Sequence, residues 1–310
     1  MNVLSLFDGM SCGQIALNKA GIKYDKYFAS EIDKYSIKIT QKNYPNTIQL
    51  GDITKISFKD GVLSTENNTY DIGKIDLVIG GSPCQDLSFA GGQSGLKEYT
   101  LQNYLTSKNS GVTFTGQSYL FWEYLRLMNE INPEHFLLEN VKMKSNWKTL
   151  ISQNLGVQPI EIDSRYFTPQ KRKRLYWTNI NVDTYNDKNI WLKDVMLNLT
   201  DPKLDIKRPT QKRMDYIQRK IDKGWLKKSH CDTTTQYSEC LMATMYKQLQ
   251  EFIWMDESSQ LRFFSPLECE RLQTVPDDYT KGVSDTQRYR MLGNGWTVDV
   301  VAHILKGLII

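Results

Sequence analysis

Short apolar runs alternate along this chain with turns and with stretches of helical spacing. The first run spans residues 1–7, a glycine-containing turn follows, and the helical stretch 14–20 ends at Gly21. Apolar runs of strand length separated by helices are typical of parallel β-sheets covered by helices. We therefore predict an α/β fold with a mostly parallel sheet. The further predicted strands are residues 27–30, 47–50, 77–79, 135–138, 157–162 and 175–180, and the further predicted helices are 119–131 and 297–308.

Three successive predicted strands end in residues suited to binding a small ligand. Gly9 lets the backbone approach a ligand closely, but the spacing does not match the GxGxxG of dinucleotide-binding proteins. Glu31 can accept hydrogen bonds from ribose hydroxyls. Alone it would suit a helix N-terminus, but three such strand tips in succession favour a ligand. Asp52 and Ile53 offer an acceptor and an apolar contact for adenine. A ribose and an adenine without phosphate recognition favour S-adenosylmethionine over a nucleotide.

A cysteine follows the predicted strand 77–79 after two glycines, a serine and a proline. The glycines permit a sharp turn and Pro83 fixes its own φ, so this loop can hold the sulfur of Cys84 in one direction. Ligands of open α/β sheets lie beyond the carboxyl ends of the strands. A lone cysteine there is normally a small apolar residue, but the preceding turn favours a nucleophile. Glu139, after the predicted strand 135–138, brings a carboxylate to the same sheet edge.

Two regions break the alternation of strands and helices. Residues 92–117 are polar with little periodicity, and loops of this length are usually functional. We predict that they form a loop that closes over the substrate beside Cys84. From about residue 181 to 261 the alternation fails again. There we predict a second, smaller domain that interrupts the first.

Charge is distributed unevenly over the 310 residues. Residues 142–228 carry 20 Lys and Arg against 9 Asp and Glu, a net charge of +11, and the remaining 19 and 26 give −7. Such asymmetry suggests a polyanionic partner, with nucleic acid as the working hypothesis and a solvated basic face as the alternative. Within the basic run 170–174, strand alternation sends Arg172 and Arg174 to one side and the two lysines to the other.

Composition excludes several other classes of protein. Hydrophobic residues make up 40% of the chain, enough for a sizeable core. The five cysteines are widely spread without a CxxC pair, which argues against zinc and against a disulfide framework. Because neither a membrane-length apolar run nor a signal peptide is evident, we expect a soluble, cytoplasmic protein.

Short motifs occur here in the order typical of one enzyme family. PCQ at 83–85, ENV at 139–141 and QxRxR at 170–174 are weak singly but specific as an ordered set. With them the chain resembles the DNA cytosine-5 methyltransferase family over nearly its whole length. Its first and last motifs, residues 7–9 and 293–296, look more like the de novo animal branch than like typical bacterial enzymes. The other matching pieces are Gly13, Glu31, Gly51-Asp52 and residues 266–273.

The resemblance implies a Rossmann-like sheet of the S-adenosylmethionine-dependent methyltransferase type with an inserted, smaller target-recognition domain. The catalytic and cofactor-binding domain would be 1–180, completed by 282–310, and the target-recognition domain 181–281. The implied reaction transfers a methyl group from S-adenosylmethionine to carbon 5 of a flipped-out cytosine, without a metal, and releases S-adenosylhomocysteine. We expect a monomer that acts on double-stranded DNA in a bacterial or phage-infected cell, in restriction-modification or in phage self-protection.

The resemblance also implies roles for four catalytic residues. Cys84 adds to carbon 6 of cytosine as a thiolate, which makes carbon 5 nucleophilic. Glu139 holds a proton against ring nitrogen 3 and accepts a hydrogen bond from the exocyclic amine. Arg174 bonds the ring carbonyl, with Arg172 as the runner-up or a supporting residue. A nearby arginine and a positive field are expected to lower the pKa of the Cys84 thiol.

Further positions are expected to bind the cofactor or the DNA. Phe7 and Leu120 are assigned to the cofactor pocket, although either could equally be a plain core residue. For any single lysine of the basic segment, a solvated side chain is the simpler interpretation. The cofactor set is Phe7, Asp8, Gly9, Met10, Ser11, Glu31, Ile32, Asp52, Ile53, Pro83, Leu120, Asn294, Gly295 and Trp296, and the DNA set is Gln85, Ser88, Asn140, Gln170, Lys212 and Arg213.

Three other functions compete with this interpretation. A related branch methylates transfer RNA, but the Cys-Phe-Thr tripeptide of its recognition region is absent here. A catalytically silent DNA-binding relative is disfavoured because Cys84, Glu139 and Arg174 are all present. A nicotinamide oxidoreductase is disfavoured by the missing GxGxxG and by the thiol at the sheet edge.

Overall fold

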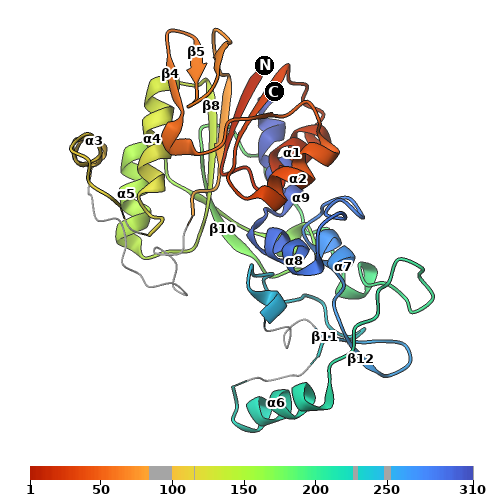
Figure 1. Ribbon diagram of the computed structural model, residues 1–310. Helices are drawn as coiled ribbons and strands as arrows, with labels where there is room; N and C mark the ends of the chain where they lie inside the picture. Colours follow the sequence, from red (N-terminus) through yellow and green to blue (C-terminus); the bar gives the residue numbers. More distant parts are fainter. Residues whose placement is uncertain (84–99, 115, 226–229, 248–252, 310) are drawn as a thin grey trace. The chain divides into compact units, whose positions relative to one another are not determined.

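The computed structural model describes residues 1–83, 100–114, 116–225, 230–247 and 253–309. The predicted site residues Cys84, Gln85 and Ser88 lie outside these ranges. The chain forms two compact units (Figure 1). The first consists of Met1–Ile162, Lys173–Asp183 and Ala302–Ile310, and the second of Asp163–Arg172 and Thr184–Val301.

A seven-stranded sheet forms the centre of the first unit, in the order β3-β2-β1-β7-β8-β10-β9. The pairs β3–β2, β2–β1, β1–β7 and β7–β8 are parallel, whereas β10 runs antiparallel to β8. The predicted α/β fold with a mostly parallel sheet is therefore confirmed. The strands are β1 (Asn2–Leu6), β2 (Lys26–Ser30), β3 (Ile48–Gln49), β7 (Leu77–Gly80), β8 (His135–Val141), β9 (Ile160–Asp163) and β10 (Lys173–Thr178).

Helices cover both faces of this sheet, with α4 and α5 on one face and α1 and α2 on the other (Figure 1). The α4 side contains the main apolar core, where Phe28, Leu138 and Trp122 belong to one buried cluster. Burial of such side chains contributes roughly 25 cal/mol per Å² of apolar surface, which makes this layer the main source of stability. The helices of this unit are α1 (Cys12–Ala20), α2 (Lys34–Asn43), α3 (Leu101–Asn109), α4 (Leu120–Ile131) and α5 (Ser145–Leu155), and α9 (Val298–Leu305) begins in the second unit and ends in the first.

Local signals fix the ends of the first two helices. Gly21 ends α1 in a left-handed conformation with φ 76°, and its N–H donates to the Asn18 carbonyl. Glycine adopts this conformation without a Cβ penalty. Asp33 begins α2 by accepting hydrogen bonds from the N–H groups of Tyr35 and Ser36. Because β1 and β2 pair in parallel, the turns that lead from them into α1 and α2 lie at the same edge of the sheet.

One prediction of local structure is wrong. The predicted loop 92–117 contains the helix α3, whose N-cap is Thr100, because the Thr100 hydroxyl accepts from the Asn103 N–H. The buried Tyr104 ring anchors this helix against Phe114 and Tyr119, a tertiary contact that no local pattern shows.

Between β3 and β7 the chain forms a small antiparallel sheet that was not predicted from the sequence. Its strands are β4 (Ser57–Lys59), β5 (Val62–Ser64) and β6 (Thr69–Asp71).

The described part of the second unit contains little regular structure. Within this unit Arg262 and Glu268 form a fully buried ion pair, with Arg262 Nη2 2.7 Å from Glu268 Oε1. Glu268 also accepts from the backbone N–H of Ser265 and so completes a capping box that begins a helix. The elements of this unit are α6 (Gln211–Asp222), β11 (Ile253–Met255), β12 (Leu261–Phe263), α7 (Pro266–Leu272) and α8 (Asp285–Asn294).

Candidate active site

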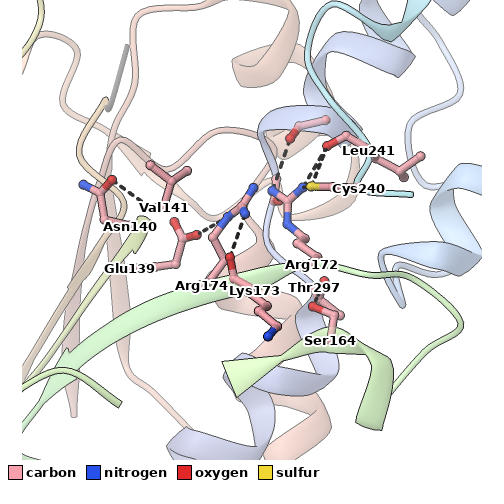
Figure 2. A network of polar contacts seen from close by, with 12 residues as sticks. Glu139, Asn140, Val141, Ser164, Arg172, Lys173, Arg174, Cys240, Leu241 and Thr297 are labelled. Atoms are coloured by element: carbon pink, nitrogen blue, oxygen red, sulfur yellow. Dashed lines mark hydrogen bonds and ion pairs between the residues drawn. The ribbon is translucent and has the colours of Figure 1, made fainter. Parts of the chain in front are cut away.

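Glu139 and Arg174 form an ion pair on neighbouring strands of the central sheet. Arg174 Nε lies 3.1 Å from Glu139 Oε1, and both side chains are largely buried (Figure 2). In the β8–β10 register Arg174 is opposite Val141 and Tyr176 is opposite Glu139, so the two charged side chains are diagonal neighbours on one face. The pair lies where the parallel strand β8 ends and the antiparallel strand β10 begins. The structure thus brings together two of the four predicted catalytic residues.

Arg172, two residues before Arg174, has a different environment. Its side chain is 3% exposed, and its guanidinium donates to three backbone carbonyls of the second unit (Figure 2). Nη1 lies 2.9 Å from the Leu241 carbonyl, and Nη2 lies 3.2 and 2.8 Å from those of Gly293 and Gly295. Its nearly complete burial argues against direct contact with a substrate. The geometry favours the supporting role for Arg172 over the catalytic one.

Asn140, beside Glu139 on β8, contacts the turn that precedes Cys84. Its Nδ2 donates to the Ser82 hydroxyl at 3.1 Å and to the Ser82 carbonyl at 3.3 Å. The side chain is buried, which argues against the predicted contact with DNA. Asn140 instead fixes the backbone one residue before the half-buried Pro83.

Gln170 is likewise buried, so its predicted contact with DNA is disfavoured. Its Nε2 donates to the Leu272 carbonyl at 3.0 Å and to Gln273 Oε1 at 3.2 Å. Gln273 Nε2 donates in turn to the carbonyls of Leu292 and Gly295. Sequence reasoning assigned no role to Gln273, although residues 266–273 were recognised as a motif. Gln170, Arg172 and Gln273 together hold the turn at Gly293–Gly295 inside the second unit.

The turn after β1 has an unusual backbone conformation. Phe7, Gly9 and Ser11 all have positive φ, at 59°, 60° and 64°. Left-handed conformations of residues other than glycine carry strain and cluster at ligand sites. A Cβ built on Gly9 meets no atom within 4 Å, so open space lies over this position. Met10 and Ser11 are buried and contribute backbone rather than side chain to that surface.

Asp8 in the same turn is a buried carboxyl group. The Tyr27 hydroxyl donates to Asp8 Oδ1 at 2.8 Å. Burial raises the pKa of Asp8 to about 6, against the lowering effect of its hydrogen bonds. The Asp8 side chain therefore stabilises the turn through its hydrogen bond with Tyr27. The carboxyl group gains or loses its proton at mildly acidic pH.

Glu31 at the tip of β2 ties three backbone groups together. Its Oε2 accepts from the Gly9 N–H, and its Oε1 accepts from the N–H groups of Ile32 and Asp33, each at 2.8 Å. Glu31 thus bonds the residues just before α2, whose N-cap is Asp33, and its bond to Gly9 links it to the β1 turn. Ile32 is 76% exposed, an apolar surface beside the carboxylate. An exposed isoleucine next to a fixed carboxylate suits a ligand with a ribose and a flat base.

Asp52 and Ile53 follow β3 and begin the short 3-10 helix η1 (Ile53–Lys55). The Asp52 carboxylate accepts from the Thr54 N–H at 2.9 Å, while Ile53 is buried. Leu120, the first residue of α4, is half-buried and packs against the main core, so the core interpretation of this residue holds in part. Phe7 packs against the same cluster.

The remaining predicted residues lie in the second unit. Asn294 ends α8, Gly295 follows it with extended backbone, and Trp296 is buried. Lys212 is exposed on α6, and the Arg213 guanidinium lies 5.7 Å from the centre of the exposed Tyr216 ring. Over the part of the chain that the structure describes, no group of three or more His, Cys, Asp and Glu could hold a metal ion. Within that part, no helix is long and apolar enough to cross a membrane.

The parallel sheet with a carboxylate and an arginine at its carboxyl edge defines an α/β protein of the methyltransferase type. A family model described as C-5 cytosine-specific DNA methylase matches residues 1–309. The chain therefore belongs to the C-5 cytosine-specific DNA methylase family, and it is an enzyme of that family, whose members use S-adenosylmethionine to methylate carbon 5 of cytosine in DNA.

Individual relatives agree with this family assignment. The chain is 27% identical over 335 residues to the type II methyltransferase M1.ScrFI of Lactococcus lactis subsp. cremoris, covering 99% of this chain and 77% of that protein. It is 29% identical to the orphan methyltransferase M.Rho11sI of Bacillus phage rho11s, over 59% of this chain and 33% of that protein. The crystal structure of S. pombe Dnmt2 methyltransferase superposes with a TM-score of 0.68 at 19% identity over all of both chains, which shows a shared fold.

Proposed function

We propose that this protein methylates carbon 5 of a flipped-out cytosine in double-stranded DNA through a transient covalent bond to Cys84. The observation that carries the proposal is the Glu139–Arg174 pair, 3.1 Å apart at the sheet edge where the strand before Cys84 also ends. A carboxyl group and a guanidinium side by side match the exocyclic amine, ring nitrogen and carbonyl along one edge of cytosine. The family assignment supplies the reaction that these groups serve.

The residues of the first unit fit S-adenosylmethionine as the cofactor, which supplies the sulfonium methyl group that carbon 5 attacks. The open space over Gly9 admits a ligand against the backbone. Glu31 retains lone pairs for ribose hydroxyls besides its three backbone contacts. Ile32 offers an exposed apolar surface to one face of adenine, and Asp52 offers an acceptor to its amino group.

Each catalytic side chain then has a defined task. The Cys84 thiolate forms a bond to carbon 6, and the electron pair moves through the ring so that carbon 5 becomes an enamine carbon. Glu139 donates a proton to ring nitrogen 3 and so neutralises the charge that this addition creates. Arg174 donates to the ring carbonyl and stabilises the same charge. After methyl transfer a base removes the carbon 5 proton, and the Cys84–carbon 6 bond breaks.

DNA binding is proposed for the inserted residues 181–281, as the target-recognition domain, with 1–180 and 282–310 as the catalytic domain. Extrusion of the base costs a few kcal/mol, which contacts to the opened duplex must offset. The exposed Lys212 and the half-buried Arg213 on α6 are candidates for phosphate contacts, which fix register without reading sequence. We propose a monomer that acts in the cytoplasm of a bacterial or phage-infected cell.

Comparison of DNA with RNA tests this function directly. The purified protein is incubated with radiolabelled S-adenosylmethionine and equal amounts of duplex DNA or transfer RNA. We expect label in DNA alone, and bisulfite sequencing of DNA from cells that express the protein then gives the methylated site. Label in transfer RNA alone would overturn the DNA assignment, and label in neither would overturn the enzymatic one.

A further inference from the structure

A fully buried carboxylate, Glu123, lies on α4 one turn after Leu120. The Tyr104 hydroxyl and the Lys108 ammonium reach it from α3. Arg126 Nε and Nη2 donate to its Oε2 at 2.9 and 2.6 Å. A carboxylate is tolerated without water only when donors surround it in this way. The chemistry proposed above uses none of these four side chains.

Arg126 connects this carboxylate to the segment that follows β3. Its Nη2 also donates to the carbonyls of Ile53 and Ile56, at 3.3 and 2.8 Å. Its Nη1 lies 2.6 Å from Glu130 Oε1. These two carbonyls belong to the first residue of η1 and to the residue just after it, so one guanidinium fixes both ends of η1 to α4. The planar fork of arginine lets Nη2 reach these carbonyls while Nε bonds Glu123 and Nη1 bonds Glu130, whereas a lysine ammonium is a single point.

A second link from the same helix reinforces this attachment. Glu130 Oε2 accepts from the backbone N–H of Phe58 at 2.9 Å, just beyond η1. From α3, Lys108 Nζ also lies 3.5 Å from the Thr54 carbonyl inside η1. Backbone groups on both sides of η1 and within it therefore depend on one network of charged side chains.

The η1 segment begins at the residues proposed to contact adenine. Asp52 is its N-terminal cap and Ile53 its first residue. The segment η1 contacts α4 directly. Burial raises the pKa of Tyr119, the residue before α4, and the Asp52 charge raises it further. A shift of η1 relative to α4 would therefore displace the Asp52 carboxylate.

We propose that Arg126, held between Glu123 and Glu130, is a positioning residue for the adenine end of the cofactor site. The inference rests on the proposed cofactor site. Arg126 is buried and acts through the Ile53 and Ile56 carbonyls, which set the place of Asp52. Glu123 orients the guanidinium and ties α3 to the same point.

Arg126→Lys tests the inference, because lysine keeps the charge beside Glu123 but its single nitrogen cannot bond both carboxylates and the two carbonyls at once. We expect the KM for S-adenosylmethionine to rise about tenfold, while kcat at saturating cofactor and the KM for DNA stay within about twofold. Tyr104→Phe is the matched control, since it removes a donor to Glu123 and leaves every Arg126 contact in place. Its cofactor KM is expected to equal that of the parent protein.

A binding measurement separates positioning from a loss of folded protein. S-inosylhomocysteine carries a carbonyl in place of the adenine amino group that Asp52 is proposed to bind. Calorimetry gives the Kd of each compound. We expect the parent protein to bind S-adenosylhomocysteine more tightly than the analogue. In Arg126→Lys we expect the ratio of the two Kd values to be closer to one. That ratio does not depend on the folded fraction.

The outcomes distinguish the inference from the proposed function. An unchanged Kd ratio together with an unchanged cofactor KM in Arg126→Lys overturns the inference. If Arg126→Lys does not fold, Glu123→Gln, which weakens the hold on the same guanidinium, is judged by the same two criteria. A parent protein that binds S-adenosylhomocysteine without discriminating against the analogue contradicts the adenine assignment and the inference with it. A parent that binds neither compound overturns the proposed function.

Discussion

Arg174 Nε lies 3.1 Å from Glu139 Oε1, across two strands that run in opposite directions. Because β10 runs antiparallel to β8, it begins at the sheet edge where β8 ends, and this brings Arg174 to Glu139. A guanidinium and a carboxyl group that hold each other are ordered before a substrate enters. Such preorganisation reduces the reorganisation that the reaction requires.

Glu139→Gln tests the proton role assigned to this carboxyl group. The amide can still hydrogen-bond but cannot deliver a proton to ring nitrogen 3, so kcat should fall about 10²- to 10⁴-fold. Methyl transfer to duplex DNA measures the loss, and binding of S-adenosylhomocysteine should be unchanged. Glu134→Gln, at an exposed position just before β8, is the control and should retain parental activity. Parental activity in Glu139→Gln would remove this residue from the mechanism.

The two arginines of the basic run should respond differently to the same change. Arg174→Lys removes a planar donor from the substrate carbonyl, and kcat should fall about 10²-fold or more with little change in stability. Arg172→Lys leaves buried carbonyls without donors, and unfolding in urea should show a loss of about 1–3 kcal/mol. If Arg172→Lys lowers kcat and leaves stability intact, its supporting role is wrong.

Asp8 predicts a pH dependence of stability. Its pKa is raised from 3.8 to about 6 in the folded protein, so the folded state holds this proton more tightly than the unfolded state. The resulting stabilisation is fully present below pH 3.8 and is lost as pH rises through about 6; it amounts to about 3 kcal/mol. Asp8→Asn lacks this loss, so its melting temperature should rise relative to the parent between pH 4 and 7. A constant difference across that range would contradict the raised pKa.

The proposed phosphate contacts of Lys212 and Arg213 on α6 predict how DNA binding depends on salt concentration. If they neutralise phosphates, Lys212→Gln and Arg213→Gln should each weaken binding of all DNA sequences and reduce the slope of log K against log salt by about 1. Fluorescence anisotropy at several salt concentrations measures both quantities. The control is Lys26→Gln, a lysine at the first position of β2, at the opposite end of that strand from Glu31. A slope equal to that of the parent in both α6 variants would favour a solvated basic face.

The sequence predicted the features that depend only on neighbouring residues. The alternation of the basic run is confirmed, because Arg172 and Arg174 are buried or half-buried while Lys171 and Lys173 are exposed. The predicted helix end at Gly21 and the carboxylate at the tip of β2 also follow from neighbouring residues alone. Alternation sets the side of a strand but not the partner on that side.

Contacts between distant segments decided the rest. The roles of Arg172 and Arg174 differ because the Arg172 guanidinium bonds the carbonyls of Gly293 and Gly295. These residues lie more than a hundred positions away in the chain. The sequence did not predict the helix α3, because its polar residues show little helical periodicity. The Tyr104 and Lys108 side chains of α3 bond Glu123, which belongs to α4. Asn140 was expected to contact DNA, whereas its amide donates a hydrogen bond to the Ser82 hydroxyl.

The central claim is a covalent bond between the Cys84 sulfur and cytosine, and a mechanism-based trap tests it most directly. Duplex DNA that contains 5-fluorocytosine at the methylated position is incubated with the protein and S-adenosylmethionine, because fluorine cannot leave as a proton does and the adduct persists. A protein–DNA band that survives denaturing electrophoresis in the parent and is absent in Cys84→Ser is the predicted result. A parent that methylates normal DNA but gives no such band, or a Cys84→Ser variant with undiminished turnover, would contradict the account.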